Sequence, residues 1–162
     1  MTSHNFAQMI KGPHYLAAAR VTFAALLVHV LNVVVQSVVK IHLMRKVKER
    51  KRLDPNYRFD RYKGDEPLLV TADRVVGNFL EWLPVFLSVL WLYAFHVGDP
   101  SWYGWVYVLA RVLYPVVAFK GGIDRRGAMP IIFISTVPQY AMLVCLGLPV
   151  AYALFVPYDD LS

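Results

Sequence analysis

The sequence predicts an all-α integral-membrane protein in which four apolar helices form one bundle. Of 162 residues, 57% are apolar and only 17% are charged, against about a quarter in an average soluble domain. The mean hydropathy is positive, at +0.44. The stretch Val21–Val39 has no charged residue and approaches the length of about 20 residues that crosses the hydrocarbon core. Because apolar segments recur along the whole chain, a cleaved signal peptide does not explain this composition.

Four segments of the chain are apolar over a length that suits a bilayer. They cover residues of about 21–39, 75–95, 102–119 and 129–156. The last contains several prolines, so we expect kinks in it or an end that protrudes. We expect residues 40–70 to form a basic loop, and the other connections to be short. At this length the four spans predict a single domain, residues 1–162, built as a four-helix bundle.

The charges outside the spans predict the orientation of the bundle. Basic residues outnumber acidic ones in the 40–70 loop and in the 120–126 connection, whereas the 96–101 turn carries only Asp99. Positive loops usually remain in the cytosol, so we expect both basic connections there and both chain ends on the far side. We expect the run Arg45–Arg52 to contact anionic lipid headgroups rather than nucleic acid, despite a net charge of +6.

Other residue types exclude some classes of site. With one cysteine, Cys145, the chain has no internal disulfide, and its histidines lack the close spacing of metal ligands, so we expect no metal. Tryptophan and tyrosine side chains gather near the far-side ends of the second and third spans, where an aromatic belt is typical. These residues are Trp91, Tyr93, Trp102, Tyr103, Trp105 and Tyr107.

Polar residues inside the spans are the candidates for function. Arg74, Asn78 and Glu81 share one face of the second helix, and Arg111 and Tyr114 share a face of the third. A charge at the bilayer centre costs roughly 3 kcal/mol, so these side chains must face protein, water or one another. In one interpretation Glu81 neutralises an arginine and only fixes helix packing. The excess of arginines favours a second interpretation, in which the site binds an anionic ligand.

Two motifs in this region resemble those of a known superfamily. Residues 74–84 match the pattern Arg-x3-Asn-x2-Glu-x2-Pro, and residues 110–114 match Ala-Arg-x2-Tyr. Both patterns are similar to those of the MAPEG superfamily, membrane-associated proteins of eicosanoid and glutathione metabolism. The superfamily includes microsomal glutathione transferases, leukotriene C synthases and lipoxygenase-activating proteins. The close resemblance covers about residues 71–126, and the four-span layout agrees with it over the whole chain.

The resemblance implies a homotrimer that binds glutathione between neighbouring subunits near the cytosolic face. The residues that it implies for glutathione binding are Arg74, Asn78, Glu81, Arg111 and Tyr114. Arg125 matches the spacing of the arginine that activates the glutathione thiol in leukotriene C synthases, which implies a catalytic role. The chemistry agrees, because guanidinium groups hold carboxylates well and a cation beside a thiol favours the reactive thiolate.

The resemblance thus implies a membrane-bound glutathione transferase or peroxidase that acts on lipophilic electrophiles or lipids. Glutathione is its co-substrate, and the expected membrane is the endoplasmic reticulum or, as an alternative, that of a mitochondrion or another organelle. Two other functions stay open: a non-catalytic member that binds lipid for a partner enzyme, and a structural subunit of a larger membrane complex. They stay open because Val76, Trp82 and Ala118 replace side chains that glutathione-using members carry.

Overall fold

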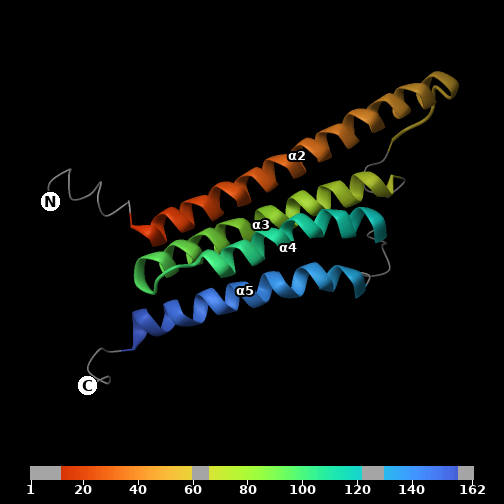
Figure 1. Cartoon of the computed structure of the whole chain (residues 1–162). Coiled ribbons are helices and arrows are strands. Elements are labelled where there is room, and N and C mark those ends of the chain that lie inside the picture. Colours follow the sequence, from red (N-terminus) through yellow and green to blue (C-terminus); the bar gives the residue numbers. More distant parts are fainter. Residues whose placement is uncertain (1–11, 60–65, 122–129, 157–162) are drawn as a thin grey trace.

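Four long helices run alternately up and down in the computed structural model, which describes residues 12–59, 66–121 and 130–156 (Figure 1). The helices are α2 (Pro13–Leu53), α3 (Pro67–His96), α4 (Ser101–Gly121) and α5 (Pro130–Phe155). Each contains an apolar segment long enough to cross a membrane. The fold is therefore that of a multi-pass membrane bundle. The expected spans fall within these helices, except that Met129 lies outside the described residues and Val156 follows the end of α5.

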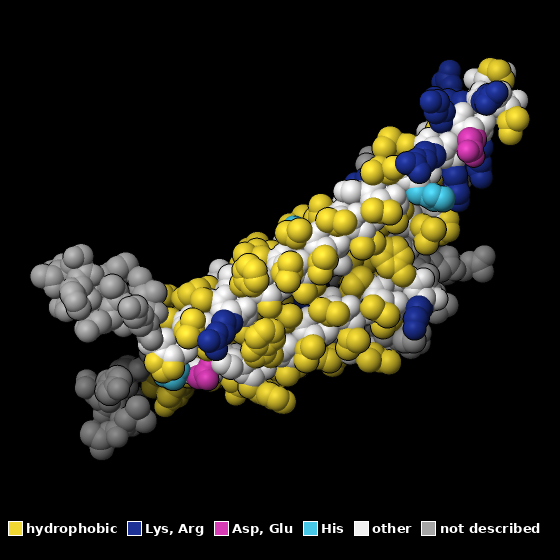
Figure 2. Space-filling model, turned by 45° about the horizontal axis from the view of Figure 1, so that its top comes forward, with side chains coloured by type: hydrophobic (Ala, Val, Ile, Leu, Met, Phe, Trp, Pro, Cys, Tyr) yellow, Lys and Arg dark blue, Asp and Glu magenta, His cyan; other side chains and the backbone are white. Residues whose placement is uncertain are grey.

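Helix α2 is much longer than its expected span. Its 41 residues extend about 60 Å, roughly twice the hydrocarbon thickness of a bilayer. The expected loop over residues 40–70 is therefore wrong at both ends, because the chain stays helical to Leu53 and α3 begins at Pro67. No glycine or proline occurs between Lys40 and Leu53, and extending a formed helix avoids the cost of nucleation. In Figure 2, several Lys and Arg side chains gather over this protruding end. The segment from Lys40 to Leu53 is called the basic end below.

The core lies along the middle of the bundle, where all four helices contribute buried apolar side chains. Helix α2 supplies Ala18, Val21 and Ala25 at intervals of three and four residues, which place them on one face. Gly104 of α4 faces Val21 so closely that a Cβ atom there would lie 2.7 Å from a Val21 methyl group. A glycine is thus needed for the approach of α4 to α2.

The turn between α3 and α4 is fixed by its own hydrogen bonds. The backbone N–H of Gly98, a residue with φ of 154°, donates to the carbonyl of Tyr93 and closes the end of α3. The carboxylate of Asp99 accepts hydrogen bonds from the hydroxyl and the backbone N–H of Ser101, the first residue of α4. These two bonds hold the pKa of Asp99 below its ordinary value. The helix pair therefore turns tightly without help from other elements.

Prolines inside the helices do not divide them. Pro84 lies within α3, Pro115 within α4, and Pro138 and Pro149 within α5. Proline lacks an N–H and clashes with the preceding turn, so each position loses one helical hydrogen bond. In a membrane bundle, groups on neighbouring helices can satisfy the freed backbone carbonyls. An interior proline is therefore better tolerated there than in an isolated helix.

Candidate functional site

Arg111 is the centre of a buried polar cluster between α3 and α4. Its side chain is 1% exposed. Its Nη1 atom donates a 2.7 Å hydrogen bond to Oδ1 of Asn78, and its Nε atom donates a 3.0 Å bond to the hydroxyl of Tyr107. The guanidinium carbon lies 5.1 Å from the ring centroids of both Phe79 and Tyr107. The structure thus brings together Asn78 and Arg111, two of the predicted site residues.

Tyr107 is a member of this cluster that the sequence analysis assigned wrongly. It was expected in the aromatic belt, but it is fully buried and stacks on Phe86 with the ring centroids 3.7 Å apart. The hydroxyl finds its partner in Arg111, one helical turn further along α4. The signal was present in the sequence, because residues four apart on a helix share a face.

The guanidinium of Arg111 contacts dipoles and aromatic rings, and its Nη2 atom has no hydrogen-bond partner among the described residues. Burying a cation in this way is costly unless its donors are satisfied. Within the described part of the chain, Glu81 forms no ion pair with Arg111 or with Arg74. The interpretation that Glu81 merely neutralises an arginine therefore finds no support within one protomer.

Arg74 and Glu81 lie on the outward face of α3. Both are exposed, and they share that face with apolar side chains such as Val85, which is 44% exposed. In an isolated protomer this surface would contact lipid, where charged side chains are costly. The two charges therefore need a further protein surface or a polar ligand.

Tyr114 is buried between α3 and α4. It is 8% exposed and packs against Val75 of α3 and Ala118 of α4. Arg74, Asn78 and Glu81 belong to α3, whereas Arg111 and Tyr114 belong to α4. Five of the six predicted site residues thus lie on two helices that pack together. The sixth, Arg125, lies outside the described residues.

Val76, Trp82 and Ala118, where the sequence departs from the pattern that the resemblance implies, all lie among the described residues. Val76 is 7% exposed and Ala118 is fully buried, so both belong to the interior of the protomer. Trp82 packs edge-on against Tyr140 of α5, with the ring centroids 4.9 Å apart. All three side chains thus contribute to helix packing and not to the outward face that carries Arg74 and Glu81.

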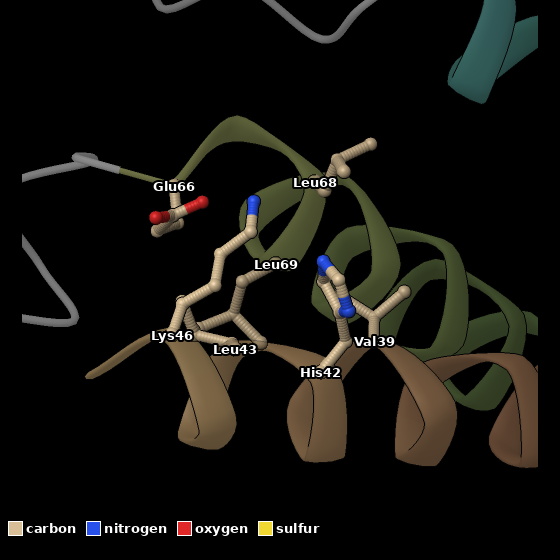
Figure 3. A pocket seen from close by; sticks show the side chains of 7 residues that line it. All are labelled: Val39, His42, Leu43, Lys46, Glu66, Leu68 and Leu69. Atoms are coloured by element: carbon tan, nitrogen blue, oxygen red, sulfur yellow. The ribbon is translucent and has the colours of Figure 1, made fainter. Parts of the chain in front are cut away.

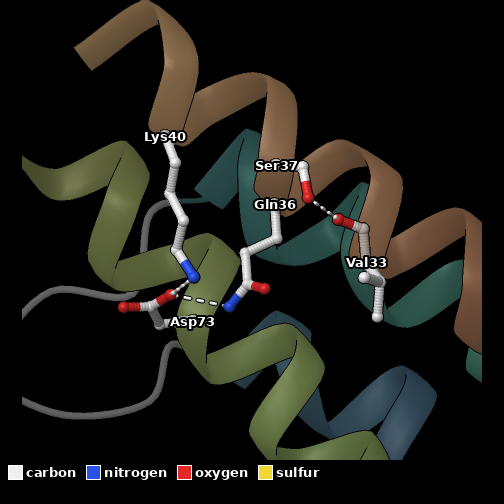
Figure 4. A network of polar contacts seen from close by, with 5 residues as sticks. All are labelled: Val33, Gln36, Ser37, Lys40 and Asp73. Atoms are coloured by element: carbon white, nitrogen blue, oxygen red, sulfur yellow. Dashed lines mark hydrogen bonds and ion pairs between the residues drawn. The ribbon is translucent and has the colours of Figure 1, made fainter. Parts of the chain in front are cut away.

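A second polar network ties α2 to α3 beside Arg74 (Figure 4). Oδ1 of Asp73 accepts a 2.7 Å hydrogen bond from Nε2 of Gln36 and lies 3.4 Å from the ammonium of Lys40. Gln36 and Lys40 are four residues apart on α2, so both reach the same carboxylate. This network fixes the start of α3 against α2, and residue spacing within one helix does not predict it.

The described part of the chain contains no group of three or more His, Cys, Asp or Glu residues that could hold a metal ion. Comparison with protein-family models matches residues 15–148, most of the chain, to the model described as the MAPEG family. No curated protein and no solved structure matches the chain.

Proposed function

Because this chain belongs to the MAPEG family, we propose that it is a membrane-bound glutathione transferase or peroxidase. The observation that carries the proposal is the pair Arg74 and Glu81. These opposite charges are exposed on a membrane-spanning helix and make no ion pair with each other within the described part of the protomer. Charges so placed require a polar ligand, a second subunit or both.

Glutathione suits this surface chemically. Its two carboxylates match guanidinium groups, which form bidentate hydrogen bonds, and its ammonium group matches Glu81. Arg74 and Glu81 are about 10 Å apart along the helix axis, so they can hold different ends of an extended tripeptide. In the proposed homotrimer, a neighbouring subunit covers this face and closes the site against lipid.

The buried cluster supports the site from behind. Asn78 belongs to the same helix as Arg74 and Glu81, and its side chain is held by Arg111. Because both partners are at least partly buried, this contact fixes the rotation of α3 with respect to α4. The outward charges then keep a set direction, which lowers the entropy lost when a ligand binds.

The proposed reaction begins with the glutathione thiolate, which Arg125 stabilises. In conjugation, the sulfur bonds to an electrophilic carbon, the leaving group departs with its electron pair, and the thiol proton passes to solvent. In peroxide reduction, two glutathione molecules supply two electrons. The lipid hydroperoxide then becomes an alcohol and water, and the two thiols become one disulfide.

Turnover separates this proposal from the non-catalytic alternatives. The purified protein is mixed with glutathione and either chlorodinitrobenzene or a fatty-acid hydroperoxide, and product formation is followed. We expect turnover with at least one substrate and a large loss in Arg74→Ala. The matched control is Arg20→Ala, which changes an exposed arginine near the N-terminal end of α2. Glutathione binding without turnover would favour the lipid-binding alternative, and absence of both would favour a structural subunit.

A further inference from the structure

A narrow crevice separates α2 from α3 at the basic end (Figure 3). Its walls include the buried side chains of Leu43 and Leu69, which are 7% and 5% exposed. Three polar side chains surround its opening: His42 and Lys46 from α2, and Glu66 directly before α3. The crevice thus has an apolar floor and a rim with both signs of charge.

The polar rim groups have no partners among the described residues. The carboxylate of Glu66 does not cap α3, although Glu66 occupies the N-cap position. Lys46 and Glu66 approach from opposite helices (Figure 3), yet no ion pair within 4.0 Å joins them. The start of α3 also carries the positive end of a helix dipole, which favours a negative group nearby. The rim can therefore accept an anion and a cation side by side.

The crevice lies at the depth of lipid headgroups. The apolar run of α2 ends at Val39, and His42 and Lys46 follow it by about 4 Å and 10 Å along the helix axis. Side chains of a helix tilt towards its N-terminus, which here means back towards the membrane. The headgroup layer is about 5–8 Å thick on each side of the hydrocarbon core. The side chains of His42 and Lys46 thus end where phosphate groups lie.

We propose that the polar rim of this crevice binds the headgroup of one zwitterionic phospholipid. Lys46 and His42 contact the phosphate, Glu66 contacts the amine, and an acyl chain follows the exposed Leu68 into the bilayer. Phosphatidylglycerol, which carries the same single phosphate, fits less well, because its headgroup lacks the amine and leaves the carboxylate of Glu66 without a partner. This site is separate from the outward face that carries Arg74 and Glu81, and it does not depend on glutathione binding.

Native mass spectrometry of the full-length protein tests the proposal with two probes of identical acyl chains, phosphatidylethanolamine and phosphatidylglycerol. We expect the wild type to retain about fivefold more phosphatidylethanolamine, the effect of one exposed ion pair. Lys46→Gln should weaken retention of both lipids. Glu66→Gln should remove the preference, because it deletes the carboxylate that contacts the amine.

The matched control is Lys48→Gln, on the same helix but outside the crevice. It should behave as the wild type. Equal losses in Lys46→Gln and Lys48→Gln would show a general attraction of lipid to the basic end and would overturn the proposal. Equal retention of both lipids by the wild type would overturn it as well. If Glu66→Gln does not fold, the wild-type preference and the comparison of the two lysines still decide.

Discussion

The Nη1 atom of Arg111 donates a 2.7 Å hydrogen bond to Oδ1 of Asn78, which joins α4 to α3 inside the bundle. Arg111 is 1% exposed, so water does not replace a lost partner there. The carbonyl oxygen of Asn78 satisfies a donor of the cation without placing a second charge in the interior. The same bond fixes the helix face that carries Arg74 and Glu81.

Removing this acceptor should destabilise the protein. We expect Asn78→Ala to lower the free energy of unfolding by about 1–3 kcal/mol, because it leaves a buried donor of Arg111 unsatisfied. Thermal unfolding in detergent measures the change. Ser88→Ala, at an exposed position of the same helix, is the control and should unfold like the wild type. If both variants unfold at the same temperature, the Asn78–Arg111 bond has no structural role.

The space around two helical glycines, Gly104 of α4 and Gly147 of α5, predicts different effects of alanine there. Gly104→Ala should cost about 1–3 kcal/mol, because the new methyl group would lie 2.7 Å and 2.9 Å from the methyl groups of Val21. Gly147→Ala should be neutral or stabilising, since its nearest contact is 4.0 Å and alanine favours the helix. Unfolding temperatures of the two variants check this. A tolerated Gly104→Ala would contradict the packing of α2 on α4.

Much of the fold was predictable because hydropathy indicates which segments are more stable in the hydrocarbon core than in water. The four spans follow from that property alone. The extension of α2 beyond Lys40 was not predictable in this way, because a charged segment outside the membrane can be a loop or a helix. The helix continues because nothing interrupts it before Pro55.

The candidate site was predictable only in part. The spacing of Arg74, Asn78 and Glu81 predicts that they share one face of α3, and the family resemblance implies that this face binds glutathione. The sequence could not show that Arg111 pairs with Asn78 or that Gln36 binds Asp73, because contacts between helices depend on their register and rotation. Neither is encoded in the spacing within one helix.

Membrane topology follows from the charge distribution and can be measured directly. Single cysteines at Arg50→Cys and Asp99→Cys, in a Cys145→Ser background, should be labelled from opposite sides of sealed vesicles. The positive-inside rule places position 50 in the cytosol. Labelling of both positions from one side would contradict a bundle in which α3 crosses the membrane.

Arg125 decides whether the proposed site is catalytic. Arg125→Ala should reduce turnover and raise the pKa of bound glutathione thiol, with little change in glutathione affinity, because its proposed partner is the thiolate alone. Arg125→Lys should restore part of the loss, since a point charge also stabilises a thiolate. Arg126→Ala is the control. If the two alanine variants have equal, small effects, both arginines only help to set the membrane topology and neither is catalytic.

Titration calorimetry of glutathione into the detergent-solubilised protein tests the central claim most directly. We expect saturable binding by a trimeric wild type. Arg74→Ala should weaken it by about 1.5–3 kcal/mol, the range for a hydrogen bond to a charged group. It should leave the protomer folded because Arg74 is exposed there, and the trimer intact because the proposed partner of Arg74 is glutathione. A folded trimeric wild type that shows no binding, or an Arg74→Ala variant that binds as tightly, would contradict a glutathione site on the outward face of α3.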